Sequence, residues 1–540
     1  MLASRLEASA RFPRVAFEAR HAVPAIEPLR TDVAGAIVRC PRGPVAGAGQ
    51  REDVPMRVRG WREFEQAFLY PAQLDPNLPL QSPAAIRGYF DNGGEILWVV
   101  RVVSKAATAS GLLPLRAAGA EGAVGSSPRG GQKVYARTLE VSATSPGPWA
   151  NGLRVNLTLR QGGTPAGRPL ADLRVIAQNG VTLEHLMALE PARLVEEVER
   201  SAYVRLRISV PTQPGVTPAS REIRLSVDVK GGADDTPSFA EYERAARALA
   251  EEPEPAILFA PDAWTDLPPA DVHRFYQSWA DAAARGMDRI VLIDPPANTP
   301  GETLLQVANA ARTPLSRTGP DPDPDPRLAS ALALYYPYVR VPVPATSTLR
   351  AVPPSGHVAG VISRLDRERG AHHTPANSEI VGAVDIDRDY DNAERAVLNN
   401  EGLNALRCAR GRGVEVWGGR TLDRDRDRGF LAHRRLIHRL VRAMRRVAEP
   451  LVFDSNTAAL RFSLVRALTT VLLEAYRAGA LRGSRPEEAF QVVCDDGTNP
   501  PDAYDTGHCV AKVLLAPAAP MEFIQLTVSL SQDGSLEVFE

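Results

Sequence analysis

Hydrophobic and polar positions follow different periods in successive parts of the chain. The run Glu95–Val103 is rich in β-branched residues and follows an Asn-Gly-Gly turn, which predicts a buried strand. A second strand over 34–39, with helices over 61–69 and 83–91, completes an α/β pattern. The beginning of the chain therefore predicts a mixed helix and strand unit that starts near Thr31.

The middle of the chain changes period twice. Across 133–230 apolar and polar residues alternate every second position, as in Leu153–Leu159, which predicts a small β domain. From 238 to 335 helical and strand patterns alternate, which predicts parallel strands joined by helices. Strand character is expected again over Tyr335–Val341 and Val358–Ile362.

The end of the chain predicts two long helices and two terminal strands. Leu431–Val447 carries apolar residues along one helical face, and Thr457 precedes a second helix that extends to Gly479. The run 522–530 alternates as a strand does, and a strand-like tail follows at 536–540. An exposed terminal strand invites pairing with another chain unless something covers its edge.

Composition places the chain among multidomain globular proteins. Its 540 residues exceed one ordinary hydrophobic core, and 44% hydrophobic with 24% charged residues excludes a disordered chain. A net charge of -1 argues against a surface that tracks nucleic acid throughout. Four cysteines do not form a disulfide framework and suit a reducing cytoplasm. Neither a secretory signal nor an apolar stretch of membrane-spanning length is expected.

Signatures of catalysis and metal binding are weak. The chain has no phosphate loop, nucleophile elbow or H-E-x-x-H pattern, and His372-His373 has no carboxylate at a local catalytic spacing. The acidic runs 385–391 and 423–429 imitate calcium loops but lack the turn glycine and the closing glutamate. Cys494, His508 and Cys509, with two nearby aspartates, lack paired zinc knuckles. We therefore expect no enzyme activity, no cofactor and no metal.

One segment is strongly basic. Residues 404–446 hold thirteen arginines against four acidic residues, a formal charge of +9. Within the predicted helix 431–447, the face opposite the apolar stripe is mostly arginine. Such a face is compatible with solvent, acidic partners in the same chain, nucleic acid, an anionic membrane surface or an acidic protein.

Three groups of turn and cap residues, in a fixed order, resemble phage tail sheath proteins and related injection-machine sheaths. The first group comprises Thr31–Gly35, Gly43-Pro44, Trp61–Phe64 and Tyr89–Gly94. The second comprises Val352–Gly356, Ala359–Val361, Asp366, Arg369-Gly370 and Pro375–Asn377. The third runs from L-N-N-E-G-L-N-A-L-R at Leu398 to A-P-A-A-P-M-E-F-I, which includes Phe523. These groups cover about 22–105 and 330–530, whereas the middle third of the chain holds only scattered similarities.

The resemblance implies a mixed α/β multidomain fold, in which a discontinuous inner domain built from both ends of the chain carries a β-rich and α/β outer insertion. The expected regions are an extended arm at 1–30, an N-terminal core segment at 31–105, an inserted β-rich domain at 106–235, an inserted α/β domain at 236–345, a C-terminal core segment facing a tube at 346–520, and a strand-exchange segment at 521–540.

The resemblance also implies function and partners. The chain would polymerise around an inner tube as a contractile sheath, with baseplate and terminator proteins and without nucleic acid or membrane insertion. It would assemble in the cytoplasm as a component of a phage tail or tail-like particle, to be released by lysis. The residues expected to contact the tube are Arg434, Arg435, Arg439, Arg442, Arg445 and Arg446. Those expected in strand exchange are Phe523, Ile524, Leu526, Val528, Leu530, Leu536 and Val538.

Two other function classes stay open at the level of sequence. A cytosolic α/β enzyme could bind a small ligand at the strand ends of 238–345. Alternatively, the arginine-rich helix could bind nucleic acid through Arg439 and Arg442.

Overall fold

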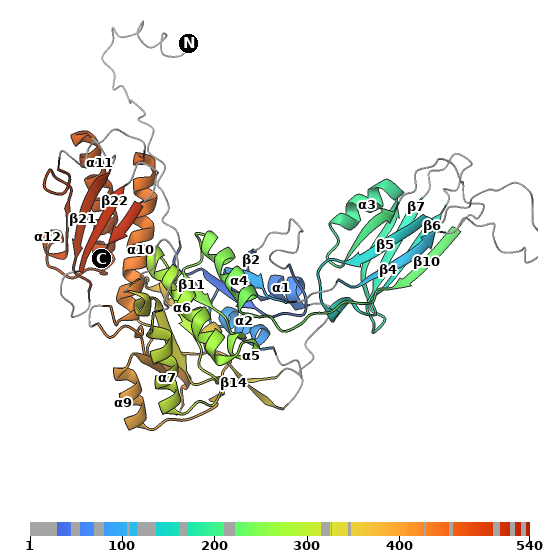
Figure 1. The fold of residues 1–540 in the computed structure, drawn as a ribbon, viewed down its shortest axis with the longest axis horizontal. Coiled ribbons are helices and arrows are strands. Elements are labelled where there is room, and N and C mark those ends of the chain that lie inside the picture. The colour runs from blue at the N-terminus through green and yellow to red at the C-terminus, as the bar shows by residue number, and fades with distance from the viewer. Residues whose placement is uncertain are drawn as a thin grey trace, which may run out of the picture.

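Three units follow one another across the molecule (Figure 1). The structure is a computed structural model, and it describes residues 30–44, 55–69, 80–104, 108–115, 137–160, 170–209, 222–314, 325, 327–343, 347–409, 411–425, 428–452, 457–500, 508–518, 524–530 and 536–539. We call these the central unit (30–104 and 236–425), the outer β unit (109–230) and the C-terminal unit (431–539). The central unit lies between the other two.

A nine-stranded sheet forms the central unit, in the order β16-β19-β18-β13-β12-β11-β1-β3-β2. Its strands are β1 Ala34–Val38, β2 Met56–Val58, β3 Leu97–Arg101, β11 Ile257–Phe259, β12 Ile290–Ile293, β13 Leu332–Tyr336, β16 Ser378–Glu379, β18 Leu403–Ala409 and β19 Gly413–Trp417. All pairs from β3 through β18 are parallel, and antiparallel strands close both edges.

This sheet corrects two predicted domain boundaries. Residues 236–345 do not form an inserted domain, because β11, β12 and β13 fill the middle of the central sheet and β1 has β3 on one side and β11 on the other. The predicted C-terminal core segment, 346–520, is likewise divided: 347–425 complete the central unit, and the chain beyond 431 forms a separate unit. Only the β-rich segment is an outward insertion.

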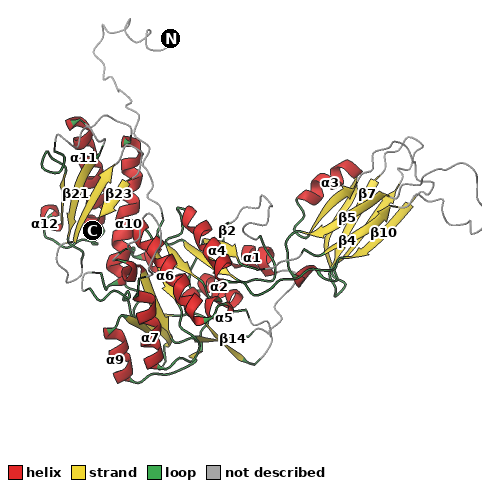
Figure 2. Ribbon diagram, viewed as in Figure 1, coloured by secondary structure: helices red, strands yellow, loops and turns green. Residues whose placement is uncertain are grey.

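Helices cover both faces of the central sheet (Figure 2). One face packs against α1 Trp61–Phe64, η3 Glu65–Leu69, α2 Ser82–Asp91 and α8 Ser355–Glu368. The other packs against α4 Phe239–Glu251, α5 Ala263–Asp266, α6 Pro269–Gly286, α7 Gly301–Arg312 and α9 Asn392–Asn400. Alternate residues of the strands enter the two cores, so the strands are hydrophobic on both faces, as buried parallel strands are.

The predicted strand at Val358–Ile362 is wrong, since these residues lie inside helix α8. Nearly every residue of α8 up to Ser363 is buried, which removes the polar positions that mark an amphipathic helix. Gly356 and Gly360 let α8 approach α2 closely. A Cβ at these positions would lie 2.2 Å from the Ala85 carbonyl oxygen and 2.3 Å from that of Tyr89.

The outer β unit consists of two antiparallel sheets, β10-β6-β7-β8 and β4-β5-β9. Its elements are β4 Ser110–Leu115, β5 Arg137–Ala143, η4 Pro148–Ala150, β6 Arg154–Arg160, β7 Leu170–Ile176, β8 Thr182–Leu189, α3 Pro191–Glu199, β9 Val204–Ser209 and β10 Glu222–Asp228. Inward residues such as Val155, Leu157 and Leu173 share a core with Val198 of α3. The β domain that the period-two pattern predicted is therefore present in the structure.

A small three-stranded sheet joins β14 Val339–Pro342 to β15 Leu349–Val352 and β17 Asp385–Ile386. Its first strand, β14, follows β13 directly along the chain, and η5 Leu328–Ala331 precedes β13.

The C-terminal unit packs two long helices on a four-stranded antiparallel sheet, β20-β21-β22-β23. Its elements are α10 Leu431–Ala448, η6 Glu449–Leu451, α11 Ala458–Arg477, α12 Pro486–Ala489, β20 Phe490–Val493, β21 Cys509–Leu515, β22 Ile524–Leu530 and β23 Leu536–Phe539. The side chain of Thr457 caps α11, as predicted, by accepting a hydrogen bond from Leu460 N at 3.3 Å. Cys509, Ala511, Val513 and Leu515 share one core with α10 and α11.

Candidate functional site at the junction of helix α10

Helix α10 belongs to two cores at once. Leu431, at its first turn, is buried in the core of the central unit, whereas Leu436, Leu440 and Met444 are buried in the core of the C-terminal unit. Met287, at the C-terminal end of α6, reaches from the central unit into the same C-terminal core. The helix therefore bridges the two units, and its polar face meets the central unit.

Arg435 forms the main polar contact of this junction. Its guanidinium binds both carboxylate oxygens of Asp366 on α8, with Nη1–Oδ1 at 2.5 Å and Nη2–Oδ2 at 2.6 Å. Nη2 also donates to the Thr31 carbonyl at 2.8 Å. The two side chains are only 4% and 3% exposed. Burial raises the pKa of Asp366 above its usual value, although the charge of Arg435 acts in the opposite direction.

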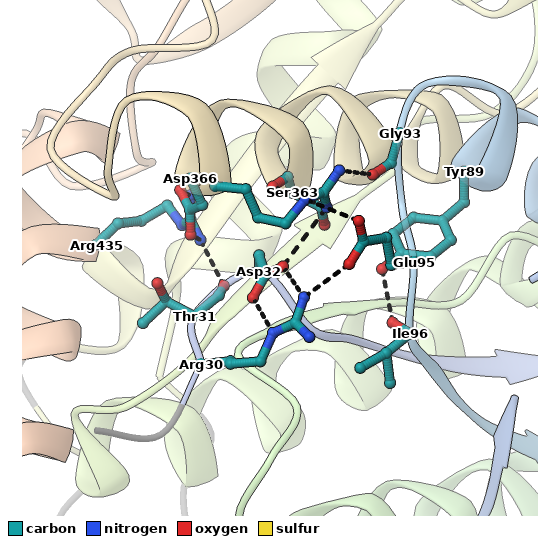
Figure 3. Close-up of polar contacts among 11 residues, drawn as sticks. Arg30, Thr31, Asp32, Tyr89, Gly93, Glu95, Ile96, Ser363, Asp366 and Arg435 are labelled. Atoms are coloured by element: carbon teal, nitrogen blue, oxygen red, sulfur yellow. Dashed lines mark hydrogen bonds and ion pairs between the residues drawn. The ribbon is translucent and has the colours of Figure 1, made fainter. Parts of the chain in front are cut away.

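The end of the predicted N-terminal arm, Arg30, and the residues after it are held at the same point (Figure 3). Arg30 donates from Nε to Asp32 at 2.8 Å and from Nη2 to Glu95 at 3.0 Å. Arg367, next to Asp366 on α8, contacts Glu95 at 3.2 Å and Asp32 at 3.5 Å. Burial raises the pKa of Asp32, but its hydrogen bond and charge interaction with Arg30 outweigh burial, so the pKa lies below its usual value.

Arg442, two turns further along α10, makes a second buried contact with the central unit. Its Nη2 donates to the carbonyl oxygens of Glu254, at 2.7 Å, and Pro253. Burial lowers the pKa of Arg442 to about 10. Burial also raises the pKa of nearby Asp288, but the charges of Arg289, Arg442 and Arg445 outweigh it and leave the pKa below its usual value. Basic side chains of α10 thus meet carbonyls and a carboxylate of the same chain.

These contacts correct the expected tube-facing set. Arg434, Arg435 and Arg442 are buried inside the chain, at 0%, 4% and 2% exposure, so they do not present a surface to a partner. Arg445 is partly exposed near Asp288, and Arg439 is also partly exposed. Arg446 is the most exposed member of the predicted set, with a side chain that is 49% exposed. The alternative of an acidic partner in the same chain holds for Arg435, which binds Asp366, whereas Arg442 donates to backbone carbonyls.

Sequence reasoning did not identify the partners of Arg435. Thr31 and Asp366 both belonged to the groups that resemble sheath proteins, but they lie far from α10 in the sequence. That these residues belong to the sheath-like groups was the one sign in the sequence that they lie close together.

The predicted strand-exchange residues pair within the chain. Ile524, Leu526, Val528 and Leu530 lie on β22, which pairs with β21, and Leu536 and Val538 lie on β23, which pairs with β22. Phe523 and most of the predicted arm lie outside the described residues. In the four-stranded sheet, β23 is paired on one side only and forms an edge.

His372 and His373 line a cavity of about 480 Å³ at the junction of the central and C-terminal units. Their ring centroids lie 4.2 Å apart, and Phe430, His433 and Arg420 complete much of the wall. No carboxylate belongs to the described lining of this cavity.

The other candidate sites have structural roles. Asp391 caps α9 by accepting from Glu394 N at 2.7 Å, and Arg428 contacts Asp423 at 3.0 Å. Across the described ranges, no group of three or more His, Cys, Asp or Glu residues is placed to hold a metal ion. Likewise, none of the described helices combines the length and the apolar character that crossing a membrane requires.

The carboxyl ends of the parallel strands, where an α/β enzyme would bind its ligand, hold two buried aspartates. Asp262, after β11, accepts from Ser82 N at 2.9 Å at the start of α2. Asp294, after β12, accepts from Ser355 N at 2.9 Å and Ser355 Oγ at 2.6 Å at the start of α8. Burial raises the pKa of Asp294 to about 7, with the Ser355 hydrogen bonds acting in the opposite direction. Both carboxylates are thus engaged in fixing helix starts.

Comparison by sequence identifies relatives of this chain. Residues 236–422 match the family described as the phage tail sheath protein central domain. The chain is 28% identical over 192 residues to the tail sheath protein of Vibrio phage KVP40, covering 34% of this chain and 27% of that protein. It is 26% identical over 207 residues to a putative prophage major tail sheath protein of Pseudomonas aeruginosa strain UCBPP-PA14, covering 36% and 50%. The matches thus span half or less of these relatives.

Comparison by structure extends the likeness over nearly the whole chain. The sheath tail protein of Listeria innocua aligns with a TM-score of 0.62 at 12% identity, covering 93% of this chain and 96% of that one. That of Desulfitobacterium hafniense aligns with a TM-score of 0.60 at 11% identity, covering 96% and 100%. The contracted helical sheath of the anti-feeding prophage aligns with a TM-score of 0.53 at 20% identity, covering 95% and 97%. Residues 236–422 of this chain thus match the tail sheath central domain in sequence, and its fold as a whole is similar to that of phage tail sheath proteins.

Proposed function

We propose that this protein is a structural subunit of a contractile sheath, which polymerises around an inner tube and contracts to drive the tube through a target envelope. The observation that carries the proposal is the sequence match of residues 236–422 to the tail sheath central domain. The fold supports it, because 95% of the chain aligns with a sheath in its contracted state. The family is a structural one, so work is done by repacking of subunits rather than by chemistry.

Assembly by strand addition is supported by the edge of the C-terminal sheet. Strand β23 pairs with β22 from Leu536 to Phe539 and leaves its other side unpaired within the described sheet. An extended segment of a neighbouring subunit can add there through main-chain hydrogen bonds, which tolerate many side chains. The segment 1–30 is the donor that we propose. Repeated strand addition would keep subunits linked while each moves as a rigid body.

Contact with the inner tube is assigned to the region of α10 that the central unit leaves accessible. Arg446 has a side chain 49% exposed, and Arg445 and Arg439 are partly exposed along the same helix. Exposed cations attract an acidic tube surface strongly at low salt and weakly at high salt, which suits a grip that must release. Baseplate and terminator proteins are proposed as further partners at the ends of the sheath.

Electron microscopy of the purified chain with size-exclusion chromatography tests the proposal. We expect hollow striated cylinders or rings, either alone or when the tube protein is co-expressed. A particle that stays monomeric with tube and baseplate proteins present would refute the proposal.

Deletion of residues 531–540 tests strand addition separately. The truncated chain should remain folded, because β23 contributes only one edge of its sheet. It should stay monomeric, because the edge that accepts the neighbouring subunit is gone. Met187→Asp is the control, since Met187 is 62% exposed on the edge strand β8 of the outer β unit and should leave assembly unchanged. Assembly of the truncated chain at the full-length level would exclude this edge as the linker.

The tube contact is tested by a salt series with charge-reversed variants. Arg446→Glu should weaken co-sedimentation of sheath with tube and flatten its salt dependence. Arg247→Glu on α4, where the arginine is 71% exposed, is the control and should behave as the unmodified chain. An attachment that is insensitive to salt would exclude the electrostatic grip while leaving the sheath function intact.

A further inference from the structure

Two of the four cysteines lie in contact within the C-terminal unit. The Sγ atoms of Cys494 and Cys509 are 3.8 Å apart, and both thiols are free. By contrast, Cys40 is buried in the central unit and Cys408 is exposed on β18. The contact brings together residues fifteen positions apart in sequence.

The backbone holds this pair on one face of the sheet. The paired ladder between β20 and β21 ends where Val493 faces Lys512, so Cys494 is the first residue beyond it. Cys509 is 3% exposed and belongs to the same core as Ala511 and Val513, against which Cys494 also packs. Both side chains therefore lie on the face of the sheet that carries this core.

Asn499 fixes the turn that follows Cys494. It is fully buried, its Nδ2 donates to the Val510 carbonyl at 2.8 Å, and its Oδ1 accepts from Val510 N at 2.6 Å. Nδ2 also lies 3.6 Å from Cys494 Sγ. The turn is thus bonded to the residue next to Cys509, which limits the separation of the two thiols.

We propose that Cys494 and Cys509 form an intramolecular disulfide when the protein meets a small-molecule disulfide oxidant, and that this bond is a modification site of the C-terminal unit. A disulfide has an S–S distance of about 2.0 Å, so the sulfur atoms must approach by roughly 2 Å, which side-chain rotation supplies. Cys494 is partly exposed, so the oxidant has access to one sulfur. This inference does not depend on sheath assembly.

The reaction is a double thiol–disulfide exchange. One cysteine thiolate attacks the small disulfide, forming a mixed disulfide and releasing one small thiol. The other cysteine then attacks the protein sulfur of the mixed disulfide and expels the second small thiol. The two thiol hydrogens of the protein end on the two small thiols, and the electrons from the two cysteine sulfurs reduce the oxidant.

The surroundings favour a thiolate on Cys509. A hydrogen bond with the Cys494 thiol lowers the pKa of Cys509, burial opposes this, and the positive charge of Arg461 on α11 adds to the lowering. A lower thiol pKa increases the thiolate fraction near neutral pH, which suits buried Cys509 to the second exchange, its attack on a mixed disulfide at the more exposed Cys494.

Oxidised glutathione is the probe for the test. The full-length chain is incubated with it, denatured, and its free thiols are counted, with peptide mapping to locate any bond. We expect the count to fall from four to two, with Cys494 and Cys509 joined, and the melting temperature of the oxidised chain to rise by several degrees, because the bond closes a loop in the unfolded state.

Two variants make the result specific. Cys494→Ser should keep its three thiols without an internal bond and show no oxidation-dependent shift in melting temperature, whereas Cys408→Ser should form the bond as the unmodified chain does. Four free thiols in the unmodified chain after prolonged oxidation would overturn the proposal, as would a bond that uses Cys408 or Cys40. Because the count is made on the unmodified chain, it holds even if a variant fails to fold.

Discussion

Breaking the Arg435–Asp366 pair should destabilise the junction of the central and C-terminal units far more than removing an exposed arginine from the same helix. In Arg435→Met, the Asp366 carboxylate, which is only 3% exposed, loses both hydrogen bonds from the guanidinium. The Thr31 carbonyl loses the third hydrogen bond that this guanidinium donates. Removing one partner of such a buried pair costs about 3–5 kcal/mol, chiefly because the remaining charge is uncompensated.

Two further variants separate the charge effect from loss of packing. The double variant Arg435→Met with Asp366→Leu removes both charges, so it should recover most of the stability, which makes the coupling free energy of the double-mutant cycle about 3 kcal/mol or more. Arg446→Met is the matched control, because its side chain is 49% exposed and lies 3.7 Å from Glu449. An exposed pair of this kind contributes at most about 1 kcal/mol.

Urea unfolding with two probes is the appropriate assay. All six tryptophans lie before residue 431, so tryptophan fluorescence reports on the central and outer β units, whereas far-UV circular dichroism reports on all three. The Arg435→Met midpoint should fall by both probes, since Asp366 and Thr31 belong to the central unit. If Arg435→Met and Arg446→Met lower stability equally, the reasoning about the buried pair is refuted.

Other substitutions test the remaining buried contacts. Burial raises the pKa of Asp294 to about 7, so the protonated carboxyl group stabilises the fold at acidic pH, and this stabilisation is lost as pH rises toward 7. Asp294→Asn should therefore flatten the fall in urea midpoint between pH 5 and pH 8. The pKa of Asp32 is lowered, so its ionised carboxylate stabilises the fold at pH values above its pKa in the unfolded chain, and this stabilisation is lost as pH falls. Asp32→Asn should therefore lower the urea midpoint at pH 7 but have little effect at pH 3. Gly360→Ala should cost about 1–3 kcal/mol, because its Cβ would meet the Tyr89 carbonyl at 2.3 Å, whereas Gly301→Ala, with no atom nearer than 3.7 Å, should change thermal stability little.

The sequence predicted well those elements whose structure is decided by residues close to them along the chain. The periods of 431–447 and 457–479 predicted α10 and α11 to within two residues at each end, and the alternation of 522–530 predicted β22. Each of these elements has one polar and one apolar side, so its period is visible in the sequence. Helix α8 lacks that contrast, because it is buried almost all round, and its Val358–Ile362 segment imitated a strand.

Pairing between distant segments was beyond local reasoning. The strands β11, β12 and β13 showed the expected parallel α/β character, but nothing in 236–345 indicates that β1, over two hundred residues earlier, is their neighbour. Parallel strands are joined by long crossovers, so the order of strands in the sheet is not given by order in the sequence. The resulting prediction of two separate domains was therefore wrong although most of the elements were right.

The arginine face of α10 shows why the polar side of an amphipathic helix does not identify the exposed side in a protein of several units. The pattern separates polar from apolar positions, but a second unit of the same chain can occupy the polar side, as Asp366 and the Glu254 carbonyl do here. Separating α10 from the central unit would leave Asp366 and the Glu254 carbonyl without these partners. That cost favours movement of the central and C-terminal units together as one body. In the sheath that we propose, rearrangement between subunits is then expected at breakable contacts such as the β23 edge and the exposed end of α10, rather than at the Arg435 junction.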